Sequence, residues 1–331
     1  MSVMTLPKAE LHLHIEGTME PALVFELAAR NRVAVPFAGI EDLRGRYVFG
    51  DLQSFLNLYY SAMDVLRTAE DFTDLARVYL ARAHSQGVRH VEMFFDPQPH
   101  VDRDVPIEAV IDGLRAALDE AEHSGWMTGG LILCFLRDRG PDDAESVLKA
   151  ARSRIESLIG VGLDSAEVGH PPGVFRRVYD MARGHGLHTV AHAGEEGPPS
   201  YVWEALDVLG VDRIDHGIRS MEDPDLVRRL RQDRTPLTVC PLSNVRLGAV
   251  EHLGLHPLPQ MLAENLMVTV NSDDPAYFGG YVGDNYAACE QELGLDRQQL
   301  VLLAQNSINA SFASAERKAT LLSEIDSWTR S

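Results

Sequence analysis

The stretch KAELHLHIEG, residues 8–17, carries the alternation that decides how this chain folds. His12 and His14 stand two residues apart, and Glu16 follows at the same spacing. In a β-strand, residues two apart project from the same face, whereas on a helix they do not face each other. If this segment is a strand, its end presents two imidazoles and a carboxylate together, which raises the question of what they bind.

Seven further short apolar runs follow along the chain, with segments of helical periodicity between them. Residues 70–87 and 106–125 carry apolar side chains at helical spacing and end in glycine. Alternation of strands and helices predicts parallel βαβ units, and eight of them predict an α/β fold of the (β/α)₈ TIM-barrel type. The expected strands lie at 9–15, 88–95, 129–136, 158–165, 187–194, 212–217, 236–242 and 266–272.

The interval between the first and second strands is too long for one crossover helix. Residues 18–31 and 51–66 have the pattern of extra helices, so we expect a helical cap insertion at about 18–85 over the C-terminal face of the barrel. Residues 296–314 are typical of a terminal helix pair. Without an internal repeat or a low-complexity linker, residues 1–331 are expected to form a single TIM-barrel domain.

The composition is that of an acidic globular protein. The 49 acidic residues exceed the 30 basic ones, giving a net charge of −19, which argues against nucleic acid or an anionic membrane as partner. Three cysteines without close spacing predict neither a disulfide scaffold nor a cysteine-based zinc site. We expect no signal peptide and no membrane span, and a cytoplasmic location.

The expected strand ends carry the residues that indicate chemistry. In such barrels the active site lies at the C-terminal ends of the strands, so side chains from several strands meet on one rim. Three imidazoles and a carboxylate suit zinc or a similar borderline ion. The predicted metal ligands are His12, His14, His192 and Asp273.

Each of these residues also has an ordinary structural explanation. A single histidine in a strand is usually a core or surface residue, the DDP triplet at 273–275 is typical of a turn, and Glu195 is compatible with a helix start. Convergence on one rim favours the site. There, His216 is expected to orient or deprotonate the attacking water, Glu195 to protonate the substrate, and Asp274 to face the substrate.

The number of metal ions follows from what the fourth strand lacks. Some amidohydrolase barrels hold two metals bridged by a carboxylated lysine at the end of strand four. Here that strand runs into residues 164–167, Asp-Ser-Ala-Glu, without a lysine, so one metal per chain is expected. Glu167 is able to bridge a second ion, so a site with two metals remains an alternative. A cytidine-deaminase type of site is excluded because no C-x-x-C follows an H-x-E.

Five motifs in family order give the chain a resemblance over nearly its whole length. They are LHLHIEG, AHAGE, DHG, CPLSN and SDDPAYFGG. The chain resembles the adenosine/adenine deaminase branch of the amidohydrolase superfamily. Further stretches, among them LPKAELHLHIEGTMEP, VEMFFDPQ and LDSAEVGHPP, are similar to the adenine deaminase subgroup.

The resemblance implies a mononuclear zinc enzyme that attacks C6 of a purine and expels ammonia. His12, His14, His192 and Asp273 match the family's ligands. Glu195 matches the residue that protonates N1, and His216 the one that orients and deprotonates the water. Asp274 matches the residue that hydrogen-bonds N7, so the roles expected from the residues and from the resemblance agree.

Substrate choice depends on two departures from adenosine-type relatives. Glu16 stands where these relatives usually have an aspartate that contacts ribose, and Glu167 stands where they have a glycine-containing stretch near the purine. Both longer side chains favour a substrate-binding pocket closed to the sugar. Alternatively, Glu16 pairs with an arginine and Glu167 caps a helix.

The expected reaction is therefore deamination of adenine to hypoxanthine and ammonia, as in purine salvage. Adenosine and N6-substituted adenines remain alternative substrates. The non-enzyme alternative is a catalytically inactive barrel that binds purines. The expected partner is a small-molecule purine, and homo-oligomer formation is left open.

Overall fold

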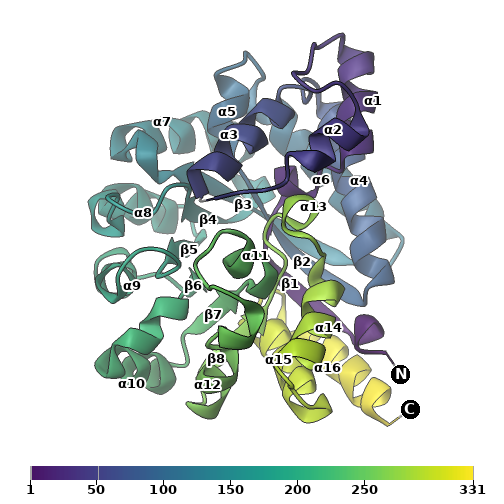
Figure 1. The fold of residues 1–331 in the computed structure, drawn as a ribbon. Helices are drawn as coiled ribbons and strands as arrows, with labels where there is room; N and C mark the ends of the chain where they lie inside the picture. Colours follow the sequence, from purple (N-terminus) through teal and green to yellow (C-terminus); the bar gives the residue numbers. More distant parts are fainter. Residues whose placement is uncertain (1, 51, 331) are drawn as a thin grey trace.

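The computed structural model describes residues 2–50 and 52–330 and consists of one eight-stranded sheet ringed by helices (Figure 1). All strand pairs are parallel and follow chain order, as short βαβ crossovers require. The strands are β1 (Lys8–His14), β2 (Val88–Phe95), β3 (Thr128–Leu136), β4 (Leu158–Asp164), β5 (His188–Ala193), β6 (Arg213–His216), β7 (Pro236–Val239) and β8 (Met267–Val270).

The sheet closes where the chain continues past β8. The Asp273 amide donates to the carbonyl of His12 at 3.1 Å, and the His14 amide donates to the carbonyl of Asp273 at 3.0 Å. These bonds join the C-terminal end of β1 to the segment after β8, so the predicted (β/α)₈ barrel is confirmed. They also place Asp273 between the two histidines of β1.

The outer layer consists of the crossover helices and a terminal helix pair. The first helix of this layer begins with a capping box between Thr68 and Asp71. The layer comprises α4 (Ala69–Ser85), α6 (Ile107–His123), α7 (Pro141–Ala150), α8 (Arg176–Gly184), α9 (Pro199–Glu204), α10 (Pro224–Asp233), α12 (Leu258–Ala263), α14 (Val282–Glu292), α15 (Arg297–Ala310) and α16 (Ala315–Thr329). None of the helices in the described part of the chain is long and apolar enough to cross a membrane.

The segment between β1 and β2 has two parts. Helices α1 (Pro21–Asn31), α2 (Ile40–Gly45) and α3 (Leu52–Met63) lie above the barrel, at the top of Figure 1. Helix α4 instead packs against α6 and β2, as a crossover helix does. The extra helices therefore end at Met63, and the expected interval 18–85 includes one ordinary barrel helix.

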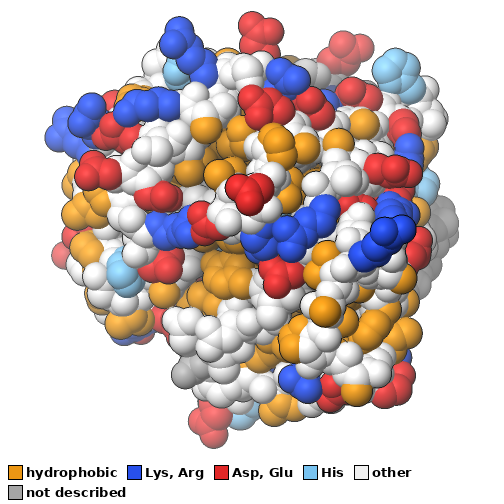
Figure 2. Space-filling view, turned by 90° about the horizontal axis from the view of Figure 1, so that it is seen from above, with side chains coloured by type: hydrophobic (Ala, Val, Ile, Leu, Met, Phe, Trp, Pro, Cys, Tyr) orange, Lys and Arg blue, Asp and Glu red, His pale blue; other side chains and the backbone are white. Residues whose placement is uncertain are grey.

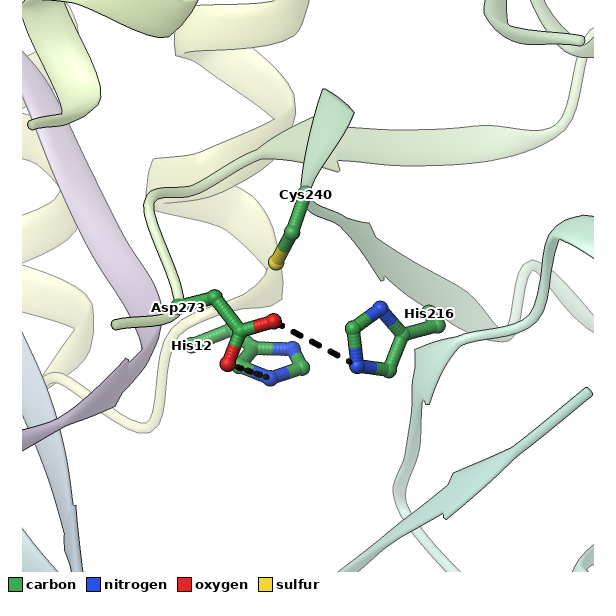
Figure 3. Close-up of side chains that lie close together, drawn as sticks. All are labelled: His12, His216, Cys240 and Asp273. Atoms are coloured by element: carbon green, nitrogen blue, oxygen red, sulfur yellow. Dashed lines mark ion pairs between the residues drawn. The ribbon is translucent and has the colours of Figure 1, made fainter. Parts of the chain in front are cut away.

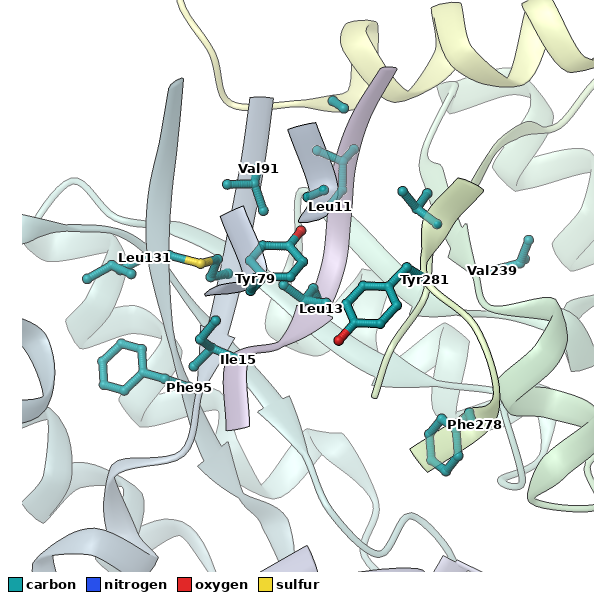
Figure 4. Packing of buried hydrophobic residues seen from close by; sticks show 14 of the residues in the cluster. Leu11, Leu13, Ile15, Tyr79, Val91, Phe95, Leu131, Val239, Phe278 and Tyr281 are labelled. Atoms are coloured by element: carbon teal, nitrogen blue, oxygen red, sulfur yellow. The ribbon is translucent and has the colours of Figure 1, made fainter. Parts of the chain in front are cut away.

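The core has an outer shell and a small interior. Between sheet and helices, Leu11 and Leu13 of β1 pack in the same cluster as Tyr79 of α4 and Tyr281 (Figure 4). Inside the barrel, a separate cluster contains Phe94, Ile132, Cys134 and Val190. The Phe94 ring contacts the imidazoles of His12, His14 and His192, so this apolar layer supports the polar rim from below.

The floor of the barrel is closed by a buried ion pair and a ring. Arg213 donates to Glu92 at 2.6 Å, and both side chains are fully buried. Phe312, between α15 and α16, lies under the Arg213 guanidinium and stacks on His188 with ring centroids 3.9 Å apart. The open end of the barrel is therefore the rim where the strands end.

Candidate active site

Four side chains from three strand ends meet at the rim. Nε2 of His14 lies 3.2 Å from Nε2 of His192, and the Nε2 atoms of His12 and His14 each lie 3.6 Å from Oδ1 of Asp273. Side chains alternate along β1, so His12 and His14 lie on the same face of the strand. Closure of the barrel then places Asp273 beside them. The structure thus brings together the four predicted metal ligands.

The geometry of these side chains fits a metal ion. Nε2 of His12 is buried and has no hydrogen-bond partner. Burying an imidazole nitrogen without a partner costs free energy. The facing Nε2 atoms of His14 and His192 also need a cation or a proton between them. Three imidazoles and one carboxylate form a donor set that zinc accepts.

The second nitrogen of each imidazole lies near an oxygen acceptor, as is usual for histidine ligands of metals. Such contacts fix the orientation of the ring and increase its basicity. The pairs are His12 with Thr238 at 3.0 Å, His14 with Asp164 at 3.5 Å and His192 with Asp215 at 3.6 Å. Thr238 also donates to Asp215 at 2.9 Å. These supporting contacts of Thr238 and Asp164 were not predicted, since neither residue carries a sequence signal.

Cys240 lies in the same cluster, which was not expected. His12, His216, Cys240 and Asp273 each offer a ligand atom, and these atoms lie within 4.8 Å of one another. Figure 3 shows the thiol directed toward the carboxylate of Asp273, which pairs with both imidazoles. Burial raises the pKa of the Cys240 thiol well above its usual range, which disfavours the thiolate that metals bind. The cluster of imidazoles around Asp273 remains the better metal site.

The two predicted catalytic residues are held by one amide. Nδ2 of Asn244, in α11 (Pro241–Arg246), donates to Glu195 at 3.0 Å and lies 3.3 Å from Nδ1 of His216. Nε2 of His256 lies 3.1 Å from Oδ1 of Asn244, and the Leu258 amide donates to Nδ1 of His256. Asn244 is therefore fixed by His256 and in turn orients both predicted catalytic groups. Asn244 belongs to the CPLSN motif, whereas nothing in the sequence distinguishes His256.

The environments of Glu195 and His216 separate their proton affinities. Burial, with the nearby Asp273 carboxylate, raises the pKa of Glu195 well above its usual range. Burial, with the nearby His12 imidazole, lowers the pKa of His216 well below its usual range. The environment thus favours the protonated form of Glu195 and the neutral form of His216, whose Oε2 and Nε2 atoms lie 3.4 Å apart, and this is a pairing suited to acid–base catalysis.

Asp274 lines the pocket, where its surroundings favour the protonated form. Burial, with the adjacent Asp273 charge, raises the pKa of Asp274 well above its usual range, and its Oδ1 has no hydrogen-bond partner. Its carboxyl group packs on Gly17, where an added Cβ would lie 1.9 Å from Oδ1. Glycine is therefore required at position 17, and Asp274 is available to donate a hydrogen bond to a ligand.

Three residues at strand ends have left-handed backbone conformations. Ser165 follows β4, His216 ends β6 and Asp273 follows β8, with φ values of 68°, 60° and 65°. Non-glycine residues with such angles are strained and cluster at functional sites. The surrounding barrel holds these turns, which direct the side chains of His216 and Asp273 toward the rim.

Glu167 was expected to line the pocket, but it is not among the residues that do so. Its carboxylate accepts four backbone hydrogen bonds of 2.6–3.1 Å from the loop after β5. The donors are the amides of Gly194, Glu195, Glu196 and Gly197. An added Cβ at Gly197 would lie 2.5 Å from this carboxylate. Glu167 thus positions the backbone of Glu195 and is neither a pocket wall nor a helix cap.

Glu16 is buried behind the pocket. Its Oε1 accepts the backbone amide of Asp96 at 3.1 Å and lies 3.0 Å from Nε2 of His100. Its hydrogen-bonding partner is thus a histidine rather than the arginine considered above, although Arg103 lies 2.9 Å from the other nitrogen of His100. Glu16 is absent from the pocket lining, and its nearest link to a ligand runs through Asp96.

The pocket is enclosed by the rim and by α3. Its empty volume is about 420 Å³, including the space at its mouth. Phe55 of α3 packs edge-on against Tyr277 and also contacts Phe278, which fixes the helix over α13 (Pro275–Phe278). Figure 2, seen from above the cap, shows hydrophobic side chains between charged groups of both signs. Leu52, Phe55, Leu56, Tyr59, Tyr60 and Leu247 line the pocket beside the polar residues.

An eight-stranded parallel barrel with this cluster at its C-terminal rim defines a hydrolytic deaminase of the amidohydrolase type. The family model described as adenosine deaminase matches residues 7–328, and the chain belongs to this family.

Named relatives support the same assignment. The chain is 59% identical to an adenine deaminase of Streptomyces coelicolor over 99% of this chain and 97% of that protein. It is similar to the crystal structure of adenine deaminase from Arthrobacter aurescens, with a TM-score of 0.97, 54% identity, and coverage of 98% and 99% of the two chains. An amidohydrolase of Burkholderia ambifaria, crystallised with bound zinc, gives a TM-score of 0.90 at 27% identity over 99% and 93%.

Proposed function

We propose that this protein deaminates adenine hydrolytically to hypoxanthine and ammonia, with one zinc ion held by His12, His14, His192 and Asp273. The observation that carries the proposal is the meeting of Glu195, His216 and Asp274 around this buried cluster, where burial favours the uncharged form of each of the three. Relatives more than half identical over nearly the whole chain are adenine deaminases, which supports adenine as the substrate.

The residues divide the reaction between them. Zinc at this site supplies Lewis acidity that makes water nucleophilic at neutral pH. His216 orients the attacking water and takes its proton. Glu195 donates a proton to N1 of the ring, which breaks conjugation and lets C6 become tetrahedral. The proton of the new C6 hydroxyl then passes to the amino group as the C6–N bond breaks and ammonia leaves, and the proton on His216 returns to Glu195. Asp274 donates a hydrogen bond to N7 and fixes the base in the pocket.

Several features favour a free base as the substrate. The pocket is closed on one side by α3 and on the other by buried carboxylates, among them Asp96 and Asp164. Because ribose needs space beyond N9, a pocket closed on both sides in this way is better suited to a base without a sugar. Glu16 contributes by holding the backbone of Asp96, and Glu167 by holding the loop of Glu195.

A substrate profile of the zinc-loaded protein tests the proposal. Ammonia release is measured with adenine, adenosine, N6-methyladenine and N6-isopentenyladenine at equal concentrations. Adenine is expected to have the highest kcat/KM. A higher value for adenosine or for an N6-substituted adenine would assign the enzyme to that substrate. Protein that binds no metal and releases no ammonia would support an inactive purine-binding barrel.

A further inference from the structure

Apart from the predicted metal ligands, the polar lining of the pocket falls into two groups. Glu195, His216 and Asp274 come from the ends of β5, β6 and β8, and form the reactive side. A second group follows the ends of β2 and β4 and consists of Asp96, Asp164 and Ser165. Because strands four apart in the order of an eight-stranded ring face each other, β2 lies across from β6 and β4 from β8.

The second group has hydrogen-bonding capacity that the protein itself does not satisfy. Oδ1 of Asp96 and Oγ of Ser165 are buried without a hydrogen-bond partner. Buried acceptors without partners are costly, so such a group at a pocket wall is matched to donors on a ligand.

Asp96 lines the pocket beside Asp164, with which its carboxyl group shares a hydrogen bond, while its Oδ1 has no partner. It is only 3% exposed, lines the pocket and occupies the N-cap position of α5 (Pro97–Val101), yet its side chain makes no capping bond. Its backbone is fixed by Glu16, at 3.1 Å. Asp164 lies 3.5 Å from Nδ1 of His14, where it supports a predicted metal ligand, and Asp96 offers an oxygen within 4.8 Å of ligand atoms of both residues.

The proposed reaction determines which part of the substrate faces Asp96. With C6, N1 and N7 directed at the reactive side, the N9 end of the purine points across the barrel. N9 carries a hydrogen in the free base and a sugar in a nucleoside. We infer that Asp96 accepts the N9–H of the base and thereby selects unsubstituted adenine over N9-substituted purines. This inference rests on the proposed function.

The role of Glu16 changes accordingly. Glu16 does not touch the ligand pocket but holds the Asp96 amide, so it is a positioning residue for the acceptor. Shortening it by one methylene withdraws the carboxylate from this amide and from His100. Selectivity then depends on Asp96 first and on Glu16 through Asp96.

Paired kinetics with adenine and 9-methyladenine test Asp96 as the selecting residue. The zinc-loaded wild type is compared with Asp96→Asn, Asp96→Ala and Glu16→Asp. Loss of the hydrogen bond to N9 is expected to lower kcat/KM for adenine roughly 10- to 100-fold in Asp96→Ala. The value for 9-methyladenine is expected to stay the same or rise. Asp96→Asn retains one acceptor oxygen, so its kcat/KM for adenine should lie between those of the wild type and Asp96→Ala. Glu16→Asp should change the ratio of the two kcat/KM values less than the Asp96 variants do.

A matched control and zinc content separate selection from structure. Asp102→Asn alters a carboxylate at the other end of α5 that pairs with Arg139, and should leave both rates unchanged. Three results would each overturn the inference. They are an equal decrease in kcat/KM for adenine and 9-methyladenine, an unchanged kcat/KM for adenine in Asp96→Ala, and loss of zinc in Asp96→Asn. Failure of the wild type to deaminate adenine would instead overturn the proposed function.

Discussion

Glu195 and His216 lie 3.4 Å apart, yet burial moves their pKa values in opposite directions. The carboxyl group favours its protonated form and the imidazole its neutral form because each is uncharged in that state. Asn244 binds both and so fixes their relative orientation. A proton donor and a proton acceptor can therefore coexist at the same pH.

Replacing Glu195 with glutamine tests its role as the proton donor. The amide keeps the size of the side chain and the hydrogen-bonding position but cannot transfer the proton. We expect Glu195→Gln to lower kcat about 10²- to 10⁴-fold with zinc still bound. Steady-state kinetics and metal analysis of the same preparation check this, and a metal-free variant would contradict the assignment.

His256 makes the stability of the protein depend on pH. Burial lowers its pKa from the ordinary value of 6.5 to about 4. Between these values the unfolded chain binds a proton that the folded chain does not, so stability is complete above pH 6.5 and is lost as the pH falls toward 4. Lowering the pH from 7 to 5 should cost about 2 kcal/mol through this residue.

Urea unfolding of the wild type and of His256→Gln at pH 7 and pH 5 measures this contribution. Glutamine stays neutral throughout, so the variant should lose less stability than the wild type over the same interval. Equal losses in the two proteins would show that His256 keeps its ordinary pKa in the folded state.

The sequence indicates some of these residues and not others. The alternation of His12 and His14, and the polar triplet at 272–274, identify the rim because strand parity and strand ends are visible in one dimension. Asn244, His256 and Asp96 depend on partners 49, 12 and 80 residues away. Such contacts exist only once the barrel has closed.

At the scale of elements, the loop after β5 is held by one side chain from the β4 loop. Glu167 satisfies four amides that otherwise have no acceptor in the loop. The sequence placed Glu167 in the pocket from its length alone, but the direction of its side chain depends on where this loop lies, and its carboxylate is directed at the loop amides. Its contribution is therefore to the geometry of Glu195.

Glu167→Ala should free the loop while leaving the metal ligands in place. We expect a decrease in kcat of at least about tenfold, with zinc content unchanged, because the proton donor is no longer held in position. Hydrogen exchange at residues 194–197 should become faster. Glu167→Gln retains one acceptor oxygen and should lie between. Unchanged exchange with full activity would contradict this role.

The strands were predicted within three residues of their observed bounds, since apolar runs bounded by polar ends mark them directly. The cap was less well delimited. Helices α3 and α4 both have a buried apolar stripe, but one packs over the barrel mouth and the other beside β2. Periodicity shows that a helix has a buried face and does not show what covers that face.

For the whole molecule, the floor of the barrel depends on a buried charge pair. Glu92 and Arg213 are fully buried, and the Arg213 charge, with burial opposing it, holds the pKa of Glu92 at about 2. Removing one partner of such a pair leaves an uncompensated charge. Neither residue was predicted to matter, because the pair joins β2 to β6 across the barrel interior.

Arg213→Met should destabilise the protein by about 3–5 kcal/mol, because Glu92 is left unpaired. The double variant Glu92→Met with Arg213→Met should recover much of this loss. Chemical unfolding of the three proteins checks the order of stability. A single variant as stable as the wild type would show that the carboxylate finds another partner.

The position of Phe312 has a consequence for how the chain is made. Its amide and ring complete the floor beneath Glu92 and Arg213, and β8 supplies the last edge of the sheet. Both lie in the final part of the sequence. During synthesis, β1 and β7 therefore keep exposed edges until nearly the whole chain has left the ribosome, and such edges invite association with other chains. We expect the nascent protein to depend on chaperones until its last two helices emerge.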